Sequence, residues 1–165
     1  MKGLNGSALA KLIGQRCEEH GVKVVNIDGV GIGKAVELAA RNWIKDDVQI
    51  NYIIGNAASP DKVRWYNYRA AMYDSLSEKI NRGEVAIPPE EFDKERTDGL
   101  LDEFRMIHME WHGTSMLIEG KDKIKKRGGH SPDVLDSIAY ALLDVNDIQA
   151  IQDDYITSDT LIENT

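Results

Sequence analysis

The stretch VKVVNIDGVGIG, residues 22–33, decides the fold class. Residues 22–27 form a short, β-branched and nearly continuous apolar run, which is typical of a strand buried on both faces of a parallel sheet. The glycines at 29, 31 and 33 then predict a tight turn in which the backbone packs closely. The stretch therefore predicts a buried strand that ends at Asp28.

The segments around this strand complete a strand–helix–strand unit. Residues 34–44 have helical character and residues 48–54 form a second apolar run, so a right-handed crossover between parallel strands is expected. Loops at the carboxyl ends of both strands then open on one side of the sheet, where a site is expected. Residues 1–21 carry apolar residues at helical spacing and stop at Gly21, which predicts a helix with a glycine C-cap.

The rest of the chain is expected to add helices over 61–82, 90–105 and 131–148, a short strand over 84–87 and a hairpin over 108–119. In the last helix, Ser131 is expected to be the N-cap and Pro132 the first helical residue. Together these segments predict an α/β fold with parallel central strands flanked by helices, plus a hairpin.

Length and composition predict one domain. The 165 residues, 42% of them hydrophobic, suffice for a single core over residues 1–150, followed by an acidic, flexible tail over 151–165. The net charge of −8 argues against coating of nucleic acid through bulk charge, so any DNA contact must be local. A lone Cys17, with no membrane-spanning apolar stretch and no signal-like N-terminus, favours a reducing cytoplasm and no membrane.

Asp28 is the first candidate for chemistry. It follows an apolar strand and precedes a glycine-rich turn, so its carboxylate is expected at the mouth of the sheet, in a position suited to a metal ion. An aspartate that caps the next helix or stabilises the turn explains the same pattern. The glycine spacing fits neither the dinucleotide-binding fingerprint nor a P-loop, which needs Ser or Thr at the position of Ala35.

The strongest local signal is KDKIKKRGGHSPDVLD, residues 121–136. Basic residues precede two carboxylates that lie three positions apart on one helical face: Lys121, Lys123, Lys125, Lys126 and Arg127, then Asp133 and Asp136. Cations about 3.5–4 Å apart, held by carboxylates, can activate water for phosphodiester hydrolysis while basic side chains hold the DNA backbone. The alternatives are dipole compensation by the acids and a solvated face for the lysines. His130 is either a metal neighbour or proton shuttle, or simply exposed.

Two further patterns have plainer explanations. His108, Glu110 and His112 would share one face of a strand and resemble a zinc arrangement, but they do not form the helical metalloprotease motif and no cysteine lies nearby. The tyrosines and apolar residues between 66 and 76 have helical spacing, and we interpret them as core or core edge rather than a base-stacking platform.

Three segments together resemble the C-terminal nuclease domain of phage terminase large subunits, a ribonuclease-H-like fold. They are VVNIDGVGIG (24–33), WYNYRAAM (65–72) and KRGGHSPDVLD (126–136), and their order and spacing match over most of the chain. The first is similar to the family's strand that ends in its second acidic metal ligand, and the third to the stretch that supplies the last one. In the second, Asn67 and Arg69 match family positions with a structural or DNA-proximal role.

The resemblance implies a hydrolase, an endonuclease dependent on Mg²⁺ or Mn²⁺, that cuts concatemeric double-stranded DNA largely without sequence preference. It implies Asp28 and Asp133 as catalytic metal ligands, with His130 as a catalytic helper and Asp136 as a further metal ligand. The partners it implies are the terminase small subunit and the portal protein, in the cytoplasm of a bacterial host.

The chain departs from the family pattern at its start. The family's first metal-binding aspartate lies on an opening strand, and two more strands follow before a helix like residues 1–21. The fold is therefore expected to be truncated, without these strands or the ATPase motor, and activity of this chain alone is expected to be weak or absent. The run 22–27 would have an open edge, which favours a homo-oligomer or a strand-donating partner.

Two other functions stay open from the sequence. A noncatalytic scaffold, or an interaction module left by a prophage, would bind no cation near Asp28 and would form a defined complex. A junction-resolving nuclease shares the fold and the acidic residues, and it would prefer branched DNA.

Overall fold

The computed structural model describes residues 5–59, 61–86 and 94–143. Its contacts divide the chain into two compact units, residues 1–55 and 56–165. The single domain expected over 1–150 spans both units, and the tail expected over 151–165 lies outside the described residues. No helix in the described ranges has the length and apolar character needed to cross a membrane.

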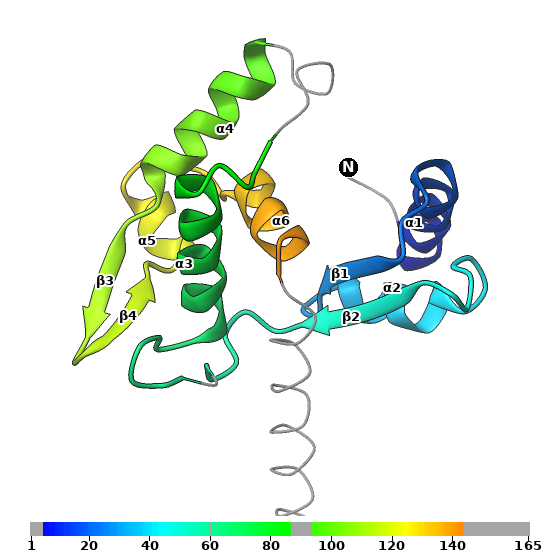
Figure 1. Cartoon of the computed structure of the whole chain (residues 1–165), viewed down its shortest axis with the longest axis horizontal. Helices are drawn as coiled ribbons and strands as arrows, with labels where there is room; N and C mark the ends of the chain where they lie inside the picture. Colours follow the sequence, from blue (N-terminus) through cyan, green and yellow to red (C-terminus); the bar gives the residue numbers. More distant parts are fainter. Residues whose placement is uncertain (1–4, 60, 87–93, 144–165) are drawn as a thin grey trace, which may run out of the picture. The chain divides into compact units, whose positions relative to one another are not determined.

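The first unit is built on a pair of parallel strands. Its elements are α1 (Gly6–His20), β1 (Val24–Asp28), α2 (Ile32–Ala40) and β2 (Gln49–Ile53), seen in blue to cyan in Figure 1. β1 and β2 run parallel in a register that pairs Val24 with Gln49 and Asp28 with Ile53. The strand–helix–strand unit predicted from the sequence is therefore confirmed, as is the preceding helix with Gly21 as its left-handed C-cap.

Small residues set the spacing of the two helices in this unit. Gly6, Ala10 and Gly14 recur every four residues on the buried face of α1. A Cβ added at Gly14 would lie 2.0 Å from the carbonyl oxygen of Trp43, and one at Gly6 would lie 2.5 Å from Ala35. Glycine is therefore required for α1 to lie this close to α2 and to the turn that follows it.

The two faces of the β1–β2 sheet have different chemistry. Val25 and Ile50 pack against a cluster of apolar residues from α1, α2 and the turn after α2, so the helices cover this face. Because side chains alternate along a strand, Asn26 and Asp28 belong to the opposite face. There the side-chain amide of Asn51 donates to Asn26 Oδ1 over 2.8 Å. Asp28 thus ends β1 on the polar face of the sheet.

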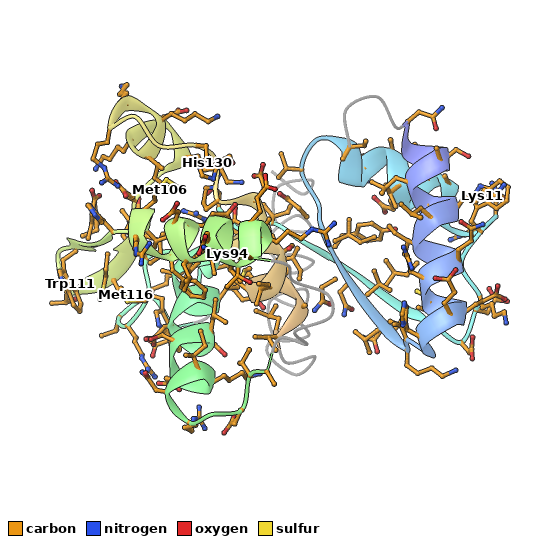
Figure 2. The ribbon with its side chains drawn as sticks, turned by 90° about the horizontal axis from the view of Figure 1, so that it is seen from above. Lys11, Lys94, Met106, Trp111, Met116 and His130 are labelled. Carbon is orange, nitrogen blue, oxygen red and sulfur yellow. The ribbon has the colours of Figure 1, made fainter. Side chains whose placement is uncertain are left out.

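The second unit contains four helices and a hairpin within the described residues. They are α3 (Tyr68–Asn81), α4 (Lys94–Met106), β3 (Met109–His112), β4 (Ser115–Ile118), α5 (Lys121–Lys126) and α6 (Asp133–Ala141). β3 and β4 pair in antiparallel fashion, as predicted, around a turn with Gly113 at φ 63°. α3 contacts both β4 and α6, and α4 contacts α6. Figure 2 shows Trp111 and Met116 on this hairpin.

Three expectations for helices in this unit need correction. α3 begins at Tyr68 rather than at residue 61, because Asn67 caps it by accepting the Ala70 N–H over 3.0 Å. The basic stretch forms a helix of its own, α5, in which Ile124 is buried. Ser131 does not cap α6, because Pro132 occupies the N-cap position and makes no side-chain cap bond.

The ends of the other segments also differ from expectation. The strand expected over 84–87 is absent over 84–86, because Gly83 at φ 70° ends α3 and the following backbone pairs with no strand in the described part of the chain; Ile87 lies outside it. The helix expected over 90–105 is α4, described from Lys94 to Met106, and the start expected at residue 90 lies outside the described residues. α6 ends at Ala141 instead of 148, and residues 144–148 are not among those described.

Close packing at Gly33 provides a test of this fold. A Cβ there would lie 1.8 Å from the backbone oxygen of Asp28, whereas at Gly99, inside α4, nothing lies within 4 Å. We expect Gly33→Ala to lower the free energy of unfolding by about 1–3 kcal/mol or more. Gly99→Ala should raise it by about 0.5–1 kcal/mol, since alanine favours a helix. Urea unfolding measures both, and unchanged stability of Gly33→Ala would contradict the close approach of α2 to β1.

Candidate functional site

Asp28 lies at the last position of β1, with its carboxylate exposed. Its Oδ1 accepts the backbone N–H of Val30 over 3.0 Å, and the N–H of Gly29 continues the sheet by donating to Ile53 O over 2.8 Å. The carboxylate therefore stabilises the turn, as the plainer interpretation of the sequence expected. Its role as a metal ligand stays a prediction.

Asp133 opens α6 and has 74% of its side chain exposed. The Ser131 hydroxyl donates to its Oδ1 over 2.6 Å, and Lys121 Nζ lies 3.4 Å from the same oxygen. The Ser131 bond, aided by the charges of Lys121 and Lys125, holds the pKa of this carboxyl below its usual value despite partial burial. Asp133 is thus an exposed, ionised carboxylate, the kind of ligand that hard divalent cations prefer.

Asp136 lies one helical turn further on and has a different environment. Only 10% of its side chain is exposed. Its Oδ1 accepts the Tyr73 hydroxyl over 2.6 Å and faces Arg69 Nη2 at 3.2 Å, while Lys121 Nζ lies 2.7 Å from Oδ2. Burial, together with this bond, raises the pKa of Tyr73 far above its ordinary value, so the phenol stays a donor. Both oxygens of Asp136 are therefore occupied by protein donors.

Lys121, expected to contact DNA, contacts both acidic residues instead. Its ammonium contacts Asp133 and Asp136, which therefore lie on the same side of α6. Partial burial alone would lower the pKa of Lys121, but the neighbouring Asp136 and Asp133 carboxylates outweigh that effect and raise it. The ammonium stays charged and balances part of the negative charge at this end of α6.

The basic residues predicted to contact DNA fall into two groups. Three of them have protein partners. Lys121 pairs with Asp133 and Asp136, and Lys123 Nζ lies 2.7 Å from Glu110. Arg127 pairs with the buried Glu119 and donates to Met106 O over 2.8 Å. Lys125 and Lys126 are exposed and have no ion pair with any described residue. Within the described chain, these two are the members of the set that form no ion pair, and the charge of Lys125 acts on Asp133 only from a distance.

His130 is exposed in the turn before α6, and it is labelled in Figure 2. Its Nε2 lies 3.7 Å from Glu103, a buried carboxylate on α4 that sequence reasoning missed. Glu103 accepts the N–H of Leu135 over 2.6 Å and faces that of Val134 at 3.4 Å, so it satisfies free amides at the start of α6. Its position three residues after the apolar Leu100, and therefore on the same side of the helix, was the available signal.

The three residues that resembled a zinc arrangement take separate partners. Glu110 pairs with Lys123, and the His112 ring lies 4.4 Å from the Tyr66 ring. His108 Nδ1 lies 3.9 Å from Glu119. Among the described residues, no group of three His, Cys, Asp or Glu side chains is arranged to hold a metal ion.

No protein-family model matches the sequence, and a comparison with curated proteins finds no match. Solved structures do match. The nuclease domain of the large terminase subunit of bacterial virus Sf6 is 17% identical and superimposes with a TM-score of 0.65, covering 82% of this chain and 71% of that domain. A point mutant of that domain with manganese gives the same TM-score and 17% identity over 82% of this chain and 72% of that one. The chain therefore has the ribonuclease-H-like fold of that domain, as the sequence predicted.

The low pKa of Asp133 predicts a pH effect. Because the folded pKa lies below the unfolded value of about 3.9, the contacts of Asp133 stabilise the fold above roughly pH 4 and are lost as pH falls through the folded pKa. Ser131→Ala should raise the Asp133 titration midpoint, followed by carboxyl ¹³C NMR. Ser137→Ala removes a hydroxyl that bonds Val134 O instead and should leave the midpoint in place. Equal midpoints in all three proteins would contradict the role of Ser131.

Proposed function

We propose that this chain is the metal-dependent endonuclease portion of a viral DNA-packaging terminase, which cuts concatemeric double-stranded DNA. The observation that carries the proposal is the combination of the terminase nuclease fold with an exposed, ionised Asp133 at the start of α6. Fold alone does not imply chemistry, so the residues at the site must support it.

The donor set fits Mg²⁺ or Mn²⁺. Asp28 and Asp133 each present an exposed carboxylate, and carboxylate oxygens are the ligands that these hard cations take in proteins. Such ions activate the attacking water and stabilise the leaving oxygen of a phosphodiester. Asp28 and Asp133 would hold them, and His130, exposed three residues before Asp133, would carry a proton to or from the reacting groups. Neighbouring structures contain manganese or calcium, which supports dependence on a divalent metal.

Lys125 and Lys126 are the residues best suited to hold the DNA backbone. Both are exposed at the end of α5, which is separated from Asp133 by a short turn that includes Gly128. Their contacts would be to phosphate, which adds affinity without sequence preference. By the same likeness, the terminase small subunit and portal protein are the proposed partners, inside a bacterial host cell.

The open edge of β1 is proposed to pair with a second copy of the chain. Lys23 O accepts from Gln49 N and Gly29 N donates to Ile53 O, both over 2.8 Å, so odd-numbered residues direct their backbone groups towards β2. The N–H and carbonyl of Val24 then point away from β2. In the described residues β1 has no strand partner besides β2, and a two-stranded parallel sheet of this size leaves an edge suited to pairing.

A noncatalytic interaction module is the second candidate. It is favoured by one observation, namely that no three potential metal ligands cluster among the described residues. Metal binding decides between the two functions.

The metal ligands are tested by Asp28→Asn and Asp133→Asn. Each should weaken Mn²⁺ binding by tenfold or more in calorimetric titration and abolish any nicking of plasmid DNA, because each removes a ligand charge. Asp98→Asn, on an exposed position of α4, is the matched control and should bind Mn²⁺ as the unaltered chain does. Cleavage that survives in the Asp28→Asn/Asp133→Asn double variant would refute the assignment, and a chain that binds no Mn²⁺ would favour the interaction module.

The β1 edge is tested by Val24→Pro against Val24→Thr. Proline removes the N–H that points away from β2 without touching the β1–β2 bonds, whereas threonine keeps it and also favours a strand. Light scattering should show a dimer for the unaltered chain and Val24→Thr, and a monomer for Val24→Pro. A monomeric unaltered chain at all concentrations would contradict the edge pairing.

A further inference from the structure

We infer that Asp136 is an anchor rather than a metal ligand, and that Tyr73 and Arg69 are positioning residues that hold it so that α6 presents Asp133 to the metal. This inference rests on the proposed function. Asp136, which the resemblance implied as a metal ligand, becomes a structural residue, and Tyr73 and Arg69 on α3 hold it in place.

The contacts of Asp136 and Arg69 link α3, α6 and the residue that follows β4. Tyr73 and Arg69, both on α3, bind Asp136 on α6 through the bonds given above. Arg69 also donates from Nη1 to the backbone oxygen of Glu119, after β4, over 2.9 Å, and its guanidinium lies 5.0 Å from the centre of the Tyr73 ring. Only 11% of the Arg69 side chain is exposed. One buried guanidinium therefore fixes α6 relative to α3 and to the end of the hairpin.

The start of α6 is held on a second side by Glu103. Its carboxylate binds the backbone of Val134 and Leu135, whereas Arg69 and Tyr73 hold the side chain of Asp136. The helix is thus restrained through both its backbone and a side chain within the same two turns. Asp133 directly precedes these restrained residues at the first position of α6, so the restraints hold the part of the helix that carries its exposed carboxylate.

A cation at Asp136 would have to displace strong partners. It would meet the Arg69 guanidinium and the Lys121 ammonium, which repel it, and it would leave the buried Tyr73 hydroxyl without its acceptor. Asp133 presents a smaller obstacle, because its partners are a serine hydroxyl and a single Lys121 contact at 3.4 Å. The two aspartates therefore have different roles. Asp133 binds the metal, and Asp136 holds α6 against α3.

The test is Tyr73→Phe, which cannot remove a metal ligand but does remove the shortest bond to Asp136. We expect Mn²⁺ affinity and the cleavage rate constant to fall by about tenfold, as is usual for residues that orient a metal ligand, with DNA affinity unchanged. Trp65→Phe is the matched control, because it breaks an indole bond of 3.0 Å to Asp74, the neighbour of Tyr73 on α3, without touching α6. Asp136→Asn keeps the shape of the anchor and should resemble Tyr73→Phe.

Amide hydrogen exchange over residues 134–137 separates this inference from the proposed function. Exchange there should accelerate about tenfold in Tyr73→Phe and remain unchanged in Trp65→Phe, whether or not the chain binds metal. Loss of Mn²⁺ binding in Asp136→Asn with full binding and unchanged exchange in Tyr73→Phe would overturn the anchor and make Asp136 a ligand. An unaltered chain that binds no Mn²⁺ would refute the proposed function, and the exchange rates would still decide the anchor.

Discussion

The carboxylate of Asp136 is buried in the second unit, where it contacts Arg69, Lys121 and the Tyr73 hydroxyl. A buried carboxylate is tolerated only when it is paired and hydrogen-bonded, and removal of one partner leaves the others unsatisfied. Because the partners come from α3 and from the start of α5, this single charge ties together segments far apart in the sequence. The start of α6, with Asp133, takes its place from that pairing.

The first unit depends on a different constraint, which is close packing. Glycines at 6, 14 and 33 let the backbones of α1, α2 and β1 approach so closely that a methyl group at any of the three would collide with a neighbour. This packing covers one face of the β1–β2 sheet and leaves the other polar, with Asp28 at its end. Close backbone contact restricts the movement of these elements, so the end of β1, where Asp28 lies, is held firmly against α2.

The periodic features of the sequence predicted most of the fold. The apolar run ending at Asp28 and the glycine turn gave β1 and the entry to α2, and the broken alternation around Gly113 gave the hairpin. The helix α5 was missed because its lysines show no apolar face beyond Ile124. The strand expected at 84–87 failed over 84–86 because β-branched composition does not form a strand without a neighbouring strand to pair with.

The candidate site was harder to derive. Motif reasoning placed Asp133 and Asp136 on one side of a helix, and Lys121 contacts both. It could not distinguish an exposed carboxylate from a buried one, because that difference depends on Tyr73 and Arg69, more than sixty residues away in the chain. Likewise, the charges of Lys123 and Arg127 are used by Glu110 and Glu119, which only tertiary structure brings near them.

The most direct measurement is a crystal structure of the chain grown with Mn²⁺, with the metal located by its anomalous scattering. We expect Mn²⁺ at the carboxylates of Asp28 and Asp133, while Asp136 keeps its bonds to Tyr73 and Arg69. Metal bound at Asp136 with those bonds broken, or Mn²⁺ at neither Asp28 nor Asp133, would contradict this expectation.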